Sequence, residues 1–499
     1  MPLETEFGRK RVIDQSSCNK DYSCVKGFCP SFVTVEGGKV RKTKTGGNRG
    51  DDFGMLPQPA LPACEQSYNI LLNGIGGTGV ITVGALLGMA AHLEGKGASV
   101  LDMTGMSQKN GSVTSHIRIV QDPARLRAQR IATGEADLVL GCDILTAGAH
   151  DAISKMRAGR TRAVINTHEQ PTGAFAKNPD WQFPLDSTER LISDSVEGRA
   201  DFINATRLAT ALMGDSIATN LFMLGFSYQK GAIPVSEAAL LRAIELNGVA
   251  IEANKQAFTW GRRAAVDLAK VEKIALPTQS VVLQMPLSLE KVIARRADFL
   301  REYQDAAYAE RYTTLVAKVR AAEQKLGKGE RLSMAVARNA YKLMAYKDEY
   351  EVARLYTNGD FTEKLKQQFD GEFSVQFNFA PPLFAKKDAQ GRLIKARYGS
   401  WMFGVLRLLA KGKRLRGTAL DIFGKTEERR MERALIAEYF AQTEALLQSL
   451  TAETLDQAVA IASLPEMIRG FGHVKEKAVG EYRARLQALQ QAGSAQKSA

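Results

Sequence analysis

The sequence predicts an α/β protein in which a mostly parallel sheet domain is followed by a mainly α-helical C-terminal domain. Short apolar runs alternate with helical patterns between residues 67 and 270. A glycine-rich turn joins the first apolar run to the first helical pattern, and long charged amphipathic patterns fill most of residues 271–492. Strands that alternate with helices pair in parallel, with helices on both faces of the sheet.

Five apolar runs are expected to form the sheet. They are Tyr68–Asn73, Ala98–Asp102, Val113–Val120, Ala136–Gly141 and Arg162–Thr167. Helical patterns through Leu221, Leu240 and Phe258 complete this domain. The C-terminal domain is expected to hold helices over 287–326, 332–356 and 427–450. One short strand is expected there, where Phe373, Val375, Phe377 and Phe379 alternate before two prolines.

The remaining boundaries follow from composition. Residues 1–42 form a cysteine-containing segment, and residues 43–66 are rich in Gly and Pro and predict a linker. The α/β domain takes residues 67–270 and the helical domain residues 271–492. The polar residues 493–499 predict a disordered tail.

The charge balance narrows the classes of partner. The 499 residues include 67 Lys and Arg against 54 Asp and Glu, a formal net charge of +13. Basic proteins bind nucleic acid, membrane surfaces or acidic proteins. No zinc finger, RNA-recognition signature or basic zipper is visible, so nucleic acid is not expected. The longest apolar stretch contains many glycines and predicts a strand and a helix, not a membrane span, and no signal peptide is seen. A cytoplasmic protein is expected.

Three cysteines near the N-terminus indicate metal or redox chemistry. Cys18, Cys24 and Cys29 lie within twelve residues, and a proline follows the last of them. A cubane iron–sulfur cluster needs four thiolates, and proline after the last cysteine is known from bacterial ferredoxins. Cys64 is a candidate fourth ligand, whereas Cys142 ends an expected strand and suits a buried position. Zinc and the absence of any metal remain alternatives.

The glycine-rich turn gives the α/β domain a Rossmann-like character. Gly74, Gly76 and Gly79 fit the pattern G-x-G-x-x-G between a strand and a helix, and Asp102 ends the next strand. This is the spacing of a dinucleotide fingerprint, in which the acid binds a ribose. The alternative is a tight turn that binds no nucleotide. In the following loop, Gln108, Lys109 and Asn110 either bind a substrate or face water.

These motifs resemble a known family. Residues 73–84 (NGIGGTGVITVG) and 101–116 (LDMTGMSQKNGSVTSH) closely resemble the gamma domain of 2-oxoacid:ferredoxin oxidoreductases. They look most like the long fused indolepyruvate ferredoxin oxidoreductases of bacteria. Residues 5–40 resemble the end of the ferredoxin-like segment of those enzymes, and the segments 343–350 and 470–476 resemble their C-terminal domain.

The resemblance implies a chemistry and a set of partners. Such enzymes decarboxylate an aryl 2-oxoacid on thiamine diphosphate and Mg²⁺, pass electrons through [4Fe-4S] clusters to ferredoxin, and pass the acyl group to coenzyme A. Cys18, Cys24 and Cys29 would belong to a cluster ligand set. Gly74, Gly76, Gly77 and Gly79, with Gln108, Lys109 and Asn110, are the expected cofactor-binding residues. The thiamine-binding part is expected on a missing or partner chain, in an oligomer, so this chain should not be active alone.

Two other functions remain open. One is a stand-alone nucleotide-binding reductase that uses the glycine turn and Asp102; the other is a truncated, non-catalytic remnant. A basic cluster of Lys411, Lys413, Arg414 and Arg416 either docks acidic ferredoxin, binds a coenzyme phosphate, or is a solvated helix end. Lys347, Asp348 and Glu349 are expected in a salt-bridge network.

Overall fold

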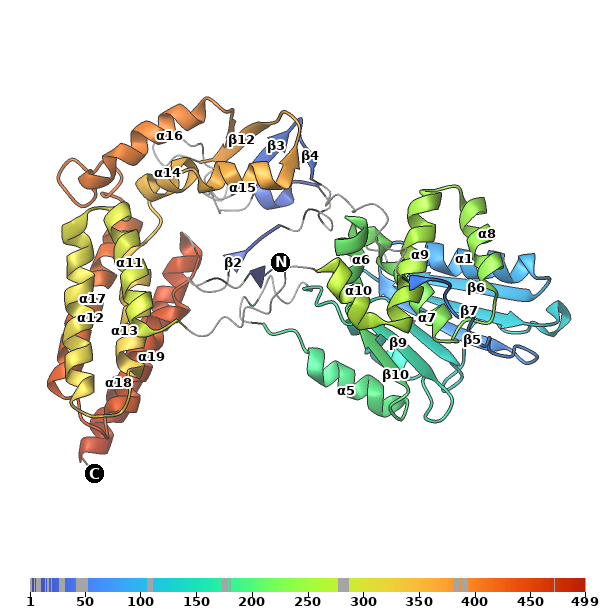
Figure 1. Cartoon of the computed structure of the whole chain (residues 1–499). Coiled ribbons are helices and arrows are strands. Elements are labelled where there is room, and N and C mark those ends of the chain that lie inside the picture. Colours follow the sequence, from blue (N-terminus) through green and yellow to red (C-terminus); the bar gives the residue numbers. More distant parts are fainter. Residues whose placement is uncertain are drawn as a thin grey trace. The chain divides into compact units, whose positions relative to one another are not determined.

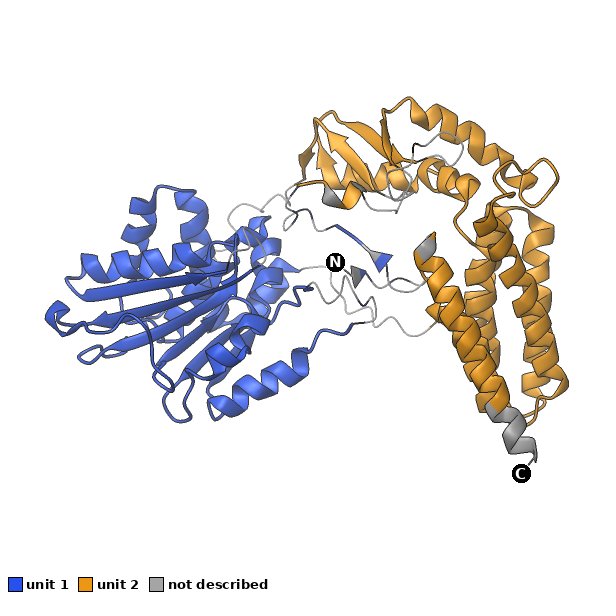
Figure 2. Ribbon diagram, turned by 180° about the vertical axis from the view of Figure 1, so that it is seen from behind, with its two compact units in different colours: residues 1–20, 42–280 blue, residues 21–41, 281–499 orange. Residues whose placement is uncertain are grey.

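The chain divides into two compact units. Unit 1 comprises residues 1–20 and 42–280, and unit 2 comprises residues 21–41 and 281–499 (Figures 1 and 2). The computed structural model describes residues 2–3, 5, 10–13, 15, 18, 20–26, 32–41, 53–105, 111–172, 178, 181–276, 287–380, 386, 394–470 and 472–498.

Unit 1 is built on a six-stranded sheet of order β10-β9-β8-β5-β7-β6. The strands are β5 Tyr68–Ile75, β6 Gly97–Thr104, β7 Ser112–Val120, β8 Leu138–Gly141, β9 Arg162–Asn166 and β10 Ala200–Ile203. Strands β10, β9, β8 and β5 pair in parallel, whereas β7 runs antiparallel between β5 and β6. The mostly parallel sheet is confirmed, with one reversed strand that its sequence pattern did not predict.

Helices cover both faces of this sheet. Leu71 and Leu72 point to opposite faces of β5, and both are fully buried. Leu72 packs with α1 Val80–Leu93, α7 Thr219–Gln229, α8 Glu237–Asn247 and α9 Ile251–Val266, and Leu71 packs with α2 Ile144–Ala147, α3 His150–Ile153 and α5 Leu185–Ser195. Unit 1 also contains α6 Ala205–Met213, α10 Leu268–Ala275, the 3₁₀ helices η3 Pro123–Arg125 and η4 Ser216–Ala218, and a short pair of strands, β1 Pro2–Leu3 and β2 Lys10–Arg11.

Helices α7 and α9 touch backbone to backbone. A Cβ atom on Gly225 would overlap the carbonyl oxygen of Phe258, and one on Gly261 would overlap that of Phe222. Only glycine fits where two helices approach this closely. This contact fixes α7, which contributes to the candidate site.

Unit 2 is mainly helical. Its helices are α11 Leu289–Tyr303, α12 Ala306–Gln324, α13 Arg331–Met344, α14 Glu349–Thr357, α15 Asp360–Gln368, α16 Met402–Lys411, α17 Glu427–Gln448, α18 Leu455–Ser463 and α19 His473–Ser498, with the 3₁₀ helices η1 Ser23–Lys26, η5 Gly412–Leu415 and η6 Leu464–Met467. Helix α19 includes residues 493–498, where composition predicts a disordered tail. No helix among the described residues is long and apolar enough to cross a membrane.

A small sheet in unit 2 contains residues from near the N-terminus. Its order is β13-β12-β3, with β13 Ala396–Tyr398, β12 Ser374–Phe379 and β3 Val33–Glu36, and β4 Lys39–Val40 pairs with β11 Phe369–Asp370. Val35 pairs with Val375, and Arg41 bonds to Asp370 at 2.7 Å. The residues that follow the cysteine cluster are therefore part of unit 2. The expected strand over 373–379 is confirmed as β12.

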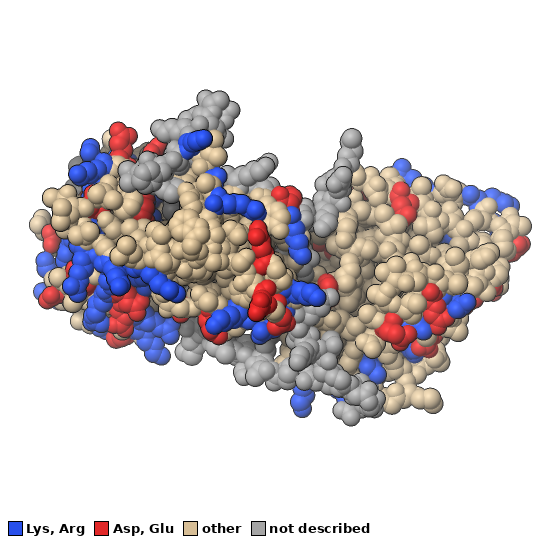
Figure 3. Space-filling model, turned by 90° about the horizontal axis from the view of Figure 1, so that it is seen from above, with Lys and Arg blue, Asp and Glu red and all other residues tan. Residues whose placement is uncertain are grey.

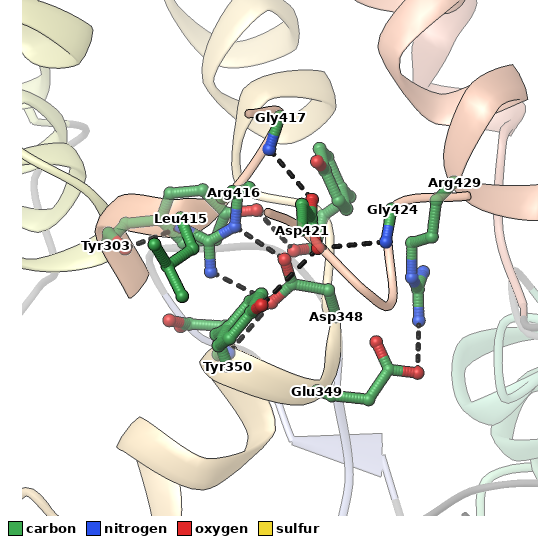
Figure 4. A network of polar contacts seen from close by, with 12 residues as sticks. Tyr303, Asp348, Glu349, Tyr350, Leu415, Arg416, Gly417, Asp421, Gly424 and Arg429 are labelled. Carbon is green, nitrogen blue, oxygen red and sulfur yellow. Dashed lines mark hydrogen bonds and ion pairs between the residues drawn. The ribbon is translucent and has the colours of Figure 1, made fainter. Parts of the chain in front are cut away.

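A buried polar network holds the loop after α16 against α14 (Figure 4). Arg416 donates to Asp348 through two nitrogens, one bond measuring 2.8 Å, and to the carbonyl oxygen of Tyr303 at 2.6 Å. Asp421 accepts from the backbone of Gly417 and Gly424 in the same loop. Arg416 is only 5% exposed, so the expectation that it lies at a solvated helix end is wrong. Its charge is neutralised by Asp348, which the sequence places in a salt-bridge network.

Candidate functional site

The glycine turn lies at the carboxyl end of the central strand β5. A side chain on Gly74 would collide with Val80 and crowd Cys142, and the N–H of Gly76 donates to the carbonyl of Gly111 at 2.7 Å. Gly77 and Gly79 have φ of 83° and 93°. These are left-handed conformations that glycine adopts without strain. Two glycines therefore serve close packing and two serve the turn itself.

Helix α1 begins at this turn with uncapped N–H groups. Gly79 is its N-cap residue, makes no side-chain cap, and no acidic residue lies in the first turn. The first N–H groups of a helix have no intrahelical partner, and the helix dipole is positive there. This end of α1 is suited to an anion such as a phosphate group.

A side chain from α7 fixes the turn. The amide nitrogen of Asn220 donates to the carbonyl oxygen of Thr78 at 2.9 Å, and Asn220 is 3% exposed. The hydroxyl of Thr78 donates to the carbonyl of Ile75 at 2.7 Å. Asn220 lies 142 residues after Thr78 in the chain, and no local motif marks it. Its contact with the turn could therefore not be predicted from the sequence.

Buried amides and hydroxyls continue along the same sheet edge. Asn166, at the end of β9, donates to the carbonyl of Cys142 and to the hydroxyl of Thr206, both at 2.9 Å. Asn73 donates to the hydroxyl of Thr114 at 3.0 Å, while its carbonyl oxygen Oδ1 has no hydrogen-bond partner among the described residues. The carboxyl edge of an α/β sheet is where ligands bind in this architecture.

The position of Asp102 does not fit the dinucleotide-binding hypothesis, which requires an acidic residue beside the glycine turn. Strand β7 separates β6 from β5, so Asp102 lies two strands away from the glycine turn. In register, Asp102 is level with Leu72, two residues before Gly74, and its carboxylate accepts from the hydroxyl of Ser115. A ribose acid belongs on the parallel strand next to the turn. Spacing along the sequence could not reveal the intervening strand.

The polar loop between β6 and β7 contacts the glycine turn at the C-terminal end of the loop, through Gly111. Gln108, Lys109 and Asn110 lie outside the described residues. The residues that flank them are described: β6 ends at Thr104, which pairs with Val113, and Gly111 accepts the hydrogen bond from Gly76. Both ends of this loop are thus at the carboxyl edge beside the turn.

The N-terminal cysteines differ from the two cysteines of unit 1's core. Cys18 is half-buried and its sulfur accepts from the N–H of Lys20 at 3.4 Å, while Cys24 is exposed in η1. Lys20 and Tyr22 between them have positive φ, 56° and 57°, which is uncommon outside glycine. Cys29 lies outside the described residues. Within the described residues no three metal-binding side chains gather.

Both N-terminal thiols nevertheless suit cluster ligation. They are accessible, and an N–H···S bond of the kind at Cys18 stabilises cluster sulfurs. Cys142 does not suit it, because burial raises the pKa of its thiol to about 12 and a protonated thiol is a poor ligand. Cys64, the candidate fourth ligand, is buried, and its thiol donates to Gln121 at 3.6 Å.

A separate hollow lies at the ends of β9 and β10. Its volume is about 220 Å³. Thr167, Asn204, Arg207, Glu189 and Glu272 are among its lining residues. Burial and the neighbouring Asp186 raise the pKa of Glu189. No residue of the glycine turn lines this hollow, so it is not part of the candidate site.

Two family models match the chain, one within unit 1 and one within unit 2. Residues 69–264 match the family described as "Pyruvate ferredoxin/flavodoxin oxidoreductase", and residues 289–488 match the "Family of unknown function (DUF6537)". The chain is similar to indolepyruvate oxidoreductase subunit IorB of Methanothermobacter thermautotrophicus, 30% identical over 206 residues, which are 40% of this chain and 99% of the relative. The same subunit of Thermococcus kodakarensis is 27% identical over 41% of this chain and 98% of the relative.

A solved structure aligns with the same share of the chain. It is the pyruvate oxidoreductase subunit PORC of Thermotoga maritima, with 19% identity, covering 40% of this chain and 96% of that protein. The TM-score is 0.30.

Proposed function

The chain belongs to the pyruvate ferredoxin/flavodoxin oxidoreductase family, and from that premise we propose that it is part of an indolepyruvate:ferredoxin oxidoreductase. In this proposal unit 1 supplies the gamma-type domain, and the N-terminal cysteines supply part of an iron–sulfur site. The supporting observation is the match of one whole IorB subunit, 99% of its length, to this chain at 30% identity. The proposed substrate class is aryl 2-oxoacids.

The net reaction of the proposed enzyme uses coenzyme A and ferredoxin in addition to the 2-oxoacid. A 2-oxoacid loses CO₂, its acyl group forms a thioester with coenzyme A, and two electrons pass to two ferredoxin molecules with release of a proton. Thiamine diphosphate with Mg²⁺, on a partner chain, supplies the carbon–carbon cleavage. An iron–sulfur cluster supplies one-electron transfer.

This chain's own residues have two roles in the proposal. Cys18, Cys24 and Cys29 would hold a cluster together with a ligand from elsewhere, since three thiolates are one short of four. The glycine turn and the uncapped start of α1 would hold a phosphate of a cofactor, since exposed N–H groups and the positive end of the helix attract anions. Asn220 acts on that site by fixing the carbonyl of Thr78, so that the turn keeps its shape without a ligand.

Serine substitutions test the cysteine assignment. Each of Cys18, Cys24 and Cys29 is replaced in turn, and the full chain is purified without oxygen together with whatever chains accompany it. We expect iron and acid-labile sulfide to fall to less than about half of the wild-type content, because serine is a poor cluster ligand. Cys142→Ser is the matched control and should keep its iron. Equal iron content in all four variants would show that this segment does not hold the cluster.

The nucleotide-binding reductase is less favoured, because Asp102 is not beside the glycine turn. Tight binding of NADH or FAD by the isolated chain, lost in Gly79→Ala, would restore it. A chain that co-purifies with neither iron nor a thiamine-binding partner would instead support the remnant.

A further inference from the structure

Helix α16 is apolar on two faces, and the rest of unit 2 covers only one of them. Met402 and Leu406 are buried against the aromatic core around β12. On the other face, Trp401, Val405 and Leu408 are exposed by 64%, 47% and 73%. These three positions follow the spacing i, i+4, i+7 and form one strip. A helix that is apolar on all sides is normally buried on all sides.

The loop that follows α16 also exposes apolar side chains. Leu420 is exposed by 71% and Ile422 by 57%. Asp421 and Arg416, in the same loop, form the buried hydrogen bonds of Figure 4, which hold the loop in place. Leu420 and Ile422 are therefore exposed on a loop whose backbone is held by buried hydrogen bonds. Large exposed apolar side chains that gather on one part of a surface mark a site of protein contact. We name the surface formed by Trp401, Val405, Leu408, Leu420 and Ile422 the α16 face.

Several basic side chains on and after α16 have no carboxylate partner among the described residues, whereas Arg397 pairs with Glu36 and Arg416 with Asp348. Between residues 395 and 425 the sequence has eight Lys or Arg and a single Asp, Asp421, which is buried. Arg407, Lys411, Arg414 and Lys425 are exposed, and none of them pairs with a carboxylate among the described residues. Figure 3, which looks down on the side where α16 lies in Figure 1, shows an uncharged area of this unit with Lys and Arg along its edge, interspersed with Asp and Glu.

A short series of contacts links the α16 face to β3, the strand that follows the cysteine segment in the sequence. The rings of Trp401 and Tyr398 are 6.1 Å apart. Tyr398 pairs with Phe377 in the small sheet, and Phe377 pairs with Val33 at the start of β3. Val33 follows Cys29 by four residues in the sequence. The α16 face and strand β3, which follows Cys24 and Cys29 in the sequence, thus both belong to unit 2, whereas Cys18 belongs to unit 1.

We propose that the α16 face is the docking surface for a small acidic electron-carrier protein. The inference rests on the proposed function, because it needs a cluster on the cysteine segment. The apolar centre gives contact area, and the unpaired cations select a partner that surrounds its own contact patch with carboxylates. A membrane surface explains the charge but not the connection to the cysteine segment. The C-terminal unit would then be the part of the enzyme that receives the acceptor.

Binding of ferredoxin tests the proposal without relying on turnover. The probe is a purified, strongly acidic bacterial ferredoxin, titrated against the full chain in its native assembly at low and high salt. Two double variants are compared with wild type: Trp401→Ser with Leu408→Ser, and Arg407→Glu with Lys411→Glu. We expect each to raise Kd at least about tenfold, the usual effect of losing central contacts. The second should also weaken the salt dependence of binding.

A matched control comes from the exposed side of α19. Val474→Ser with Lys477→Glu changes an exposed apolar side chain and an exposed cation, and Kd should stay within about twofold of wild type. Unfolding curves of all variants confirm that each is folded. The proposal is overturned if wild type does not bind ferredoxin, or if the α16 variants bind as well as the control. It is also overturned if the face binds phosphatidylglycerol vesicles or a second copy of the chain instead.

Turnover separates this proposal from the proposed function. The α16 variants should keep 2-oxoacid-dependent reduction of methyl viologen, which needs no docking site, and lose ferredoxin reduction through a higher KM. If viologen reduction is absent even in wild type, the proposed function fails. The ferredoxin titration then still tests whether the α16 face binds ferredoxin.

Discussion

The side-chain amide of Asn220 donates its hydrogen bond to the carbonyl oxygen of Thr78, in the middle of the glycine turn. Two helices of unit 1 are coupled by this bond, since Asn220 lies on α7 and the turn opens α1. The turn is therefore held in shape by its neighbours, before any ligand arrives. Its geometry depends on a residue that no motif contains.

Replacing Asn220 with Ala should loosen the glycine turn. Loss of one buried hydrogen bond, with the carbonyl of Thr78 left unsatisfied, costs about 1–3 kcal/mol. Chemical unfolding measures this, and hydrogen exchange of the amides at residues 76–80 should accelerate. The exposed Asn247 provides the control, since Asn247→Ala should change the free energy of unfolding by less than about 0.5 kcal/mol. Equal values for the two variants would contradict the role of Asn220.

The same substitution, Gly to Ala, should have opposite effects at two helical positions. At Gly225 the added methyl group overlaps the backbone of α9, and we expect destabilisation by more than about 3 kcal/mol or failure to fold. At Gly480 on α19 nothing lies within 4 Å of the added group. Gly480→Ala should stabilise the chain by about 0.5–1 kcal/mol, because alanine favours helix. Thermal unfolding distinguishes the two, and a stable Gly225→Ala variant would refute the contact.

Arg416→Met should destabilise unit 2 strongly. It leaves the carboxylate of Asp348 buried without its cation, a change that costs about 3–5 kcal/mol. Arg416 also stacks on Tyr303, with 3.6 Å between the guanidinium carbon and the ring centre. The neighbouring Arg414 is exposed, and Arg414→Met should cost less than about 0.5 kcal/mol. Urea unfolding that shows no difference between the two would mean that the ion pair is not formed.

His116 should make unit 1 less stable in mild acid. Burial, and then the charge of Arg130, lower the pKa of His116 below its ordinary value. The unfolded chain therefore takes up a proton more readily than the folded one, and stability falls as pH drops below about 6.5. In His116→Gln this part of the pH dependence should disappear, whereas in the control His92→Gln it should remain. Unfolding between pH 8 and 5 measures both, and parallel curves would contradict the assignment.

Much of unit 1 is predictable from local pattern. Tyr68–Asn73 and Val113–Val120 were expected as strands and are found as β5 and β7. The direction of β7 was not predictable, because alternation of apolar residues indicates a strand but not its orientation. That single fact moves Asp102 away from the glycine turn and changes the interpretation of a whole motif.

Unit 2 shows the other limit of local reasoning. Residues 33–36 have no partner nearby in the sequence, and they pair with β12, some 340 residues later. Arg416 belongs to a run of basic residues that suggests solvent, yet its partner Asp348 is 68 residues away and buries it. Pairings of this kind depend on the folded chain and leave no periodic signal in the sequence.

The central claim is that this chain works in an arylpyruvate-oxidising, ferredoxin-reducing assembly. The most direct test is to purify the chain from its native cells without oxygen and assay the intact assembly for indolepyruvate-dependent, coenzyme A-dependent reduction of methyl viologen. We predict reduction, together with iron, sulfide and a thiamine-binding chain in the same preparation. A folded chain that is recovered alone, without iron and without activity, would contradict the account.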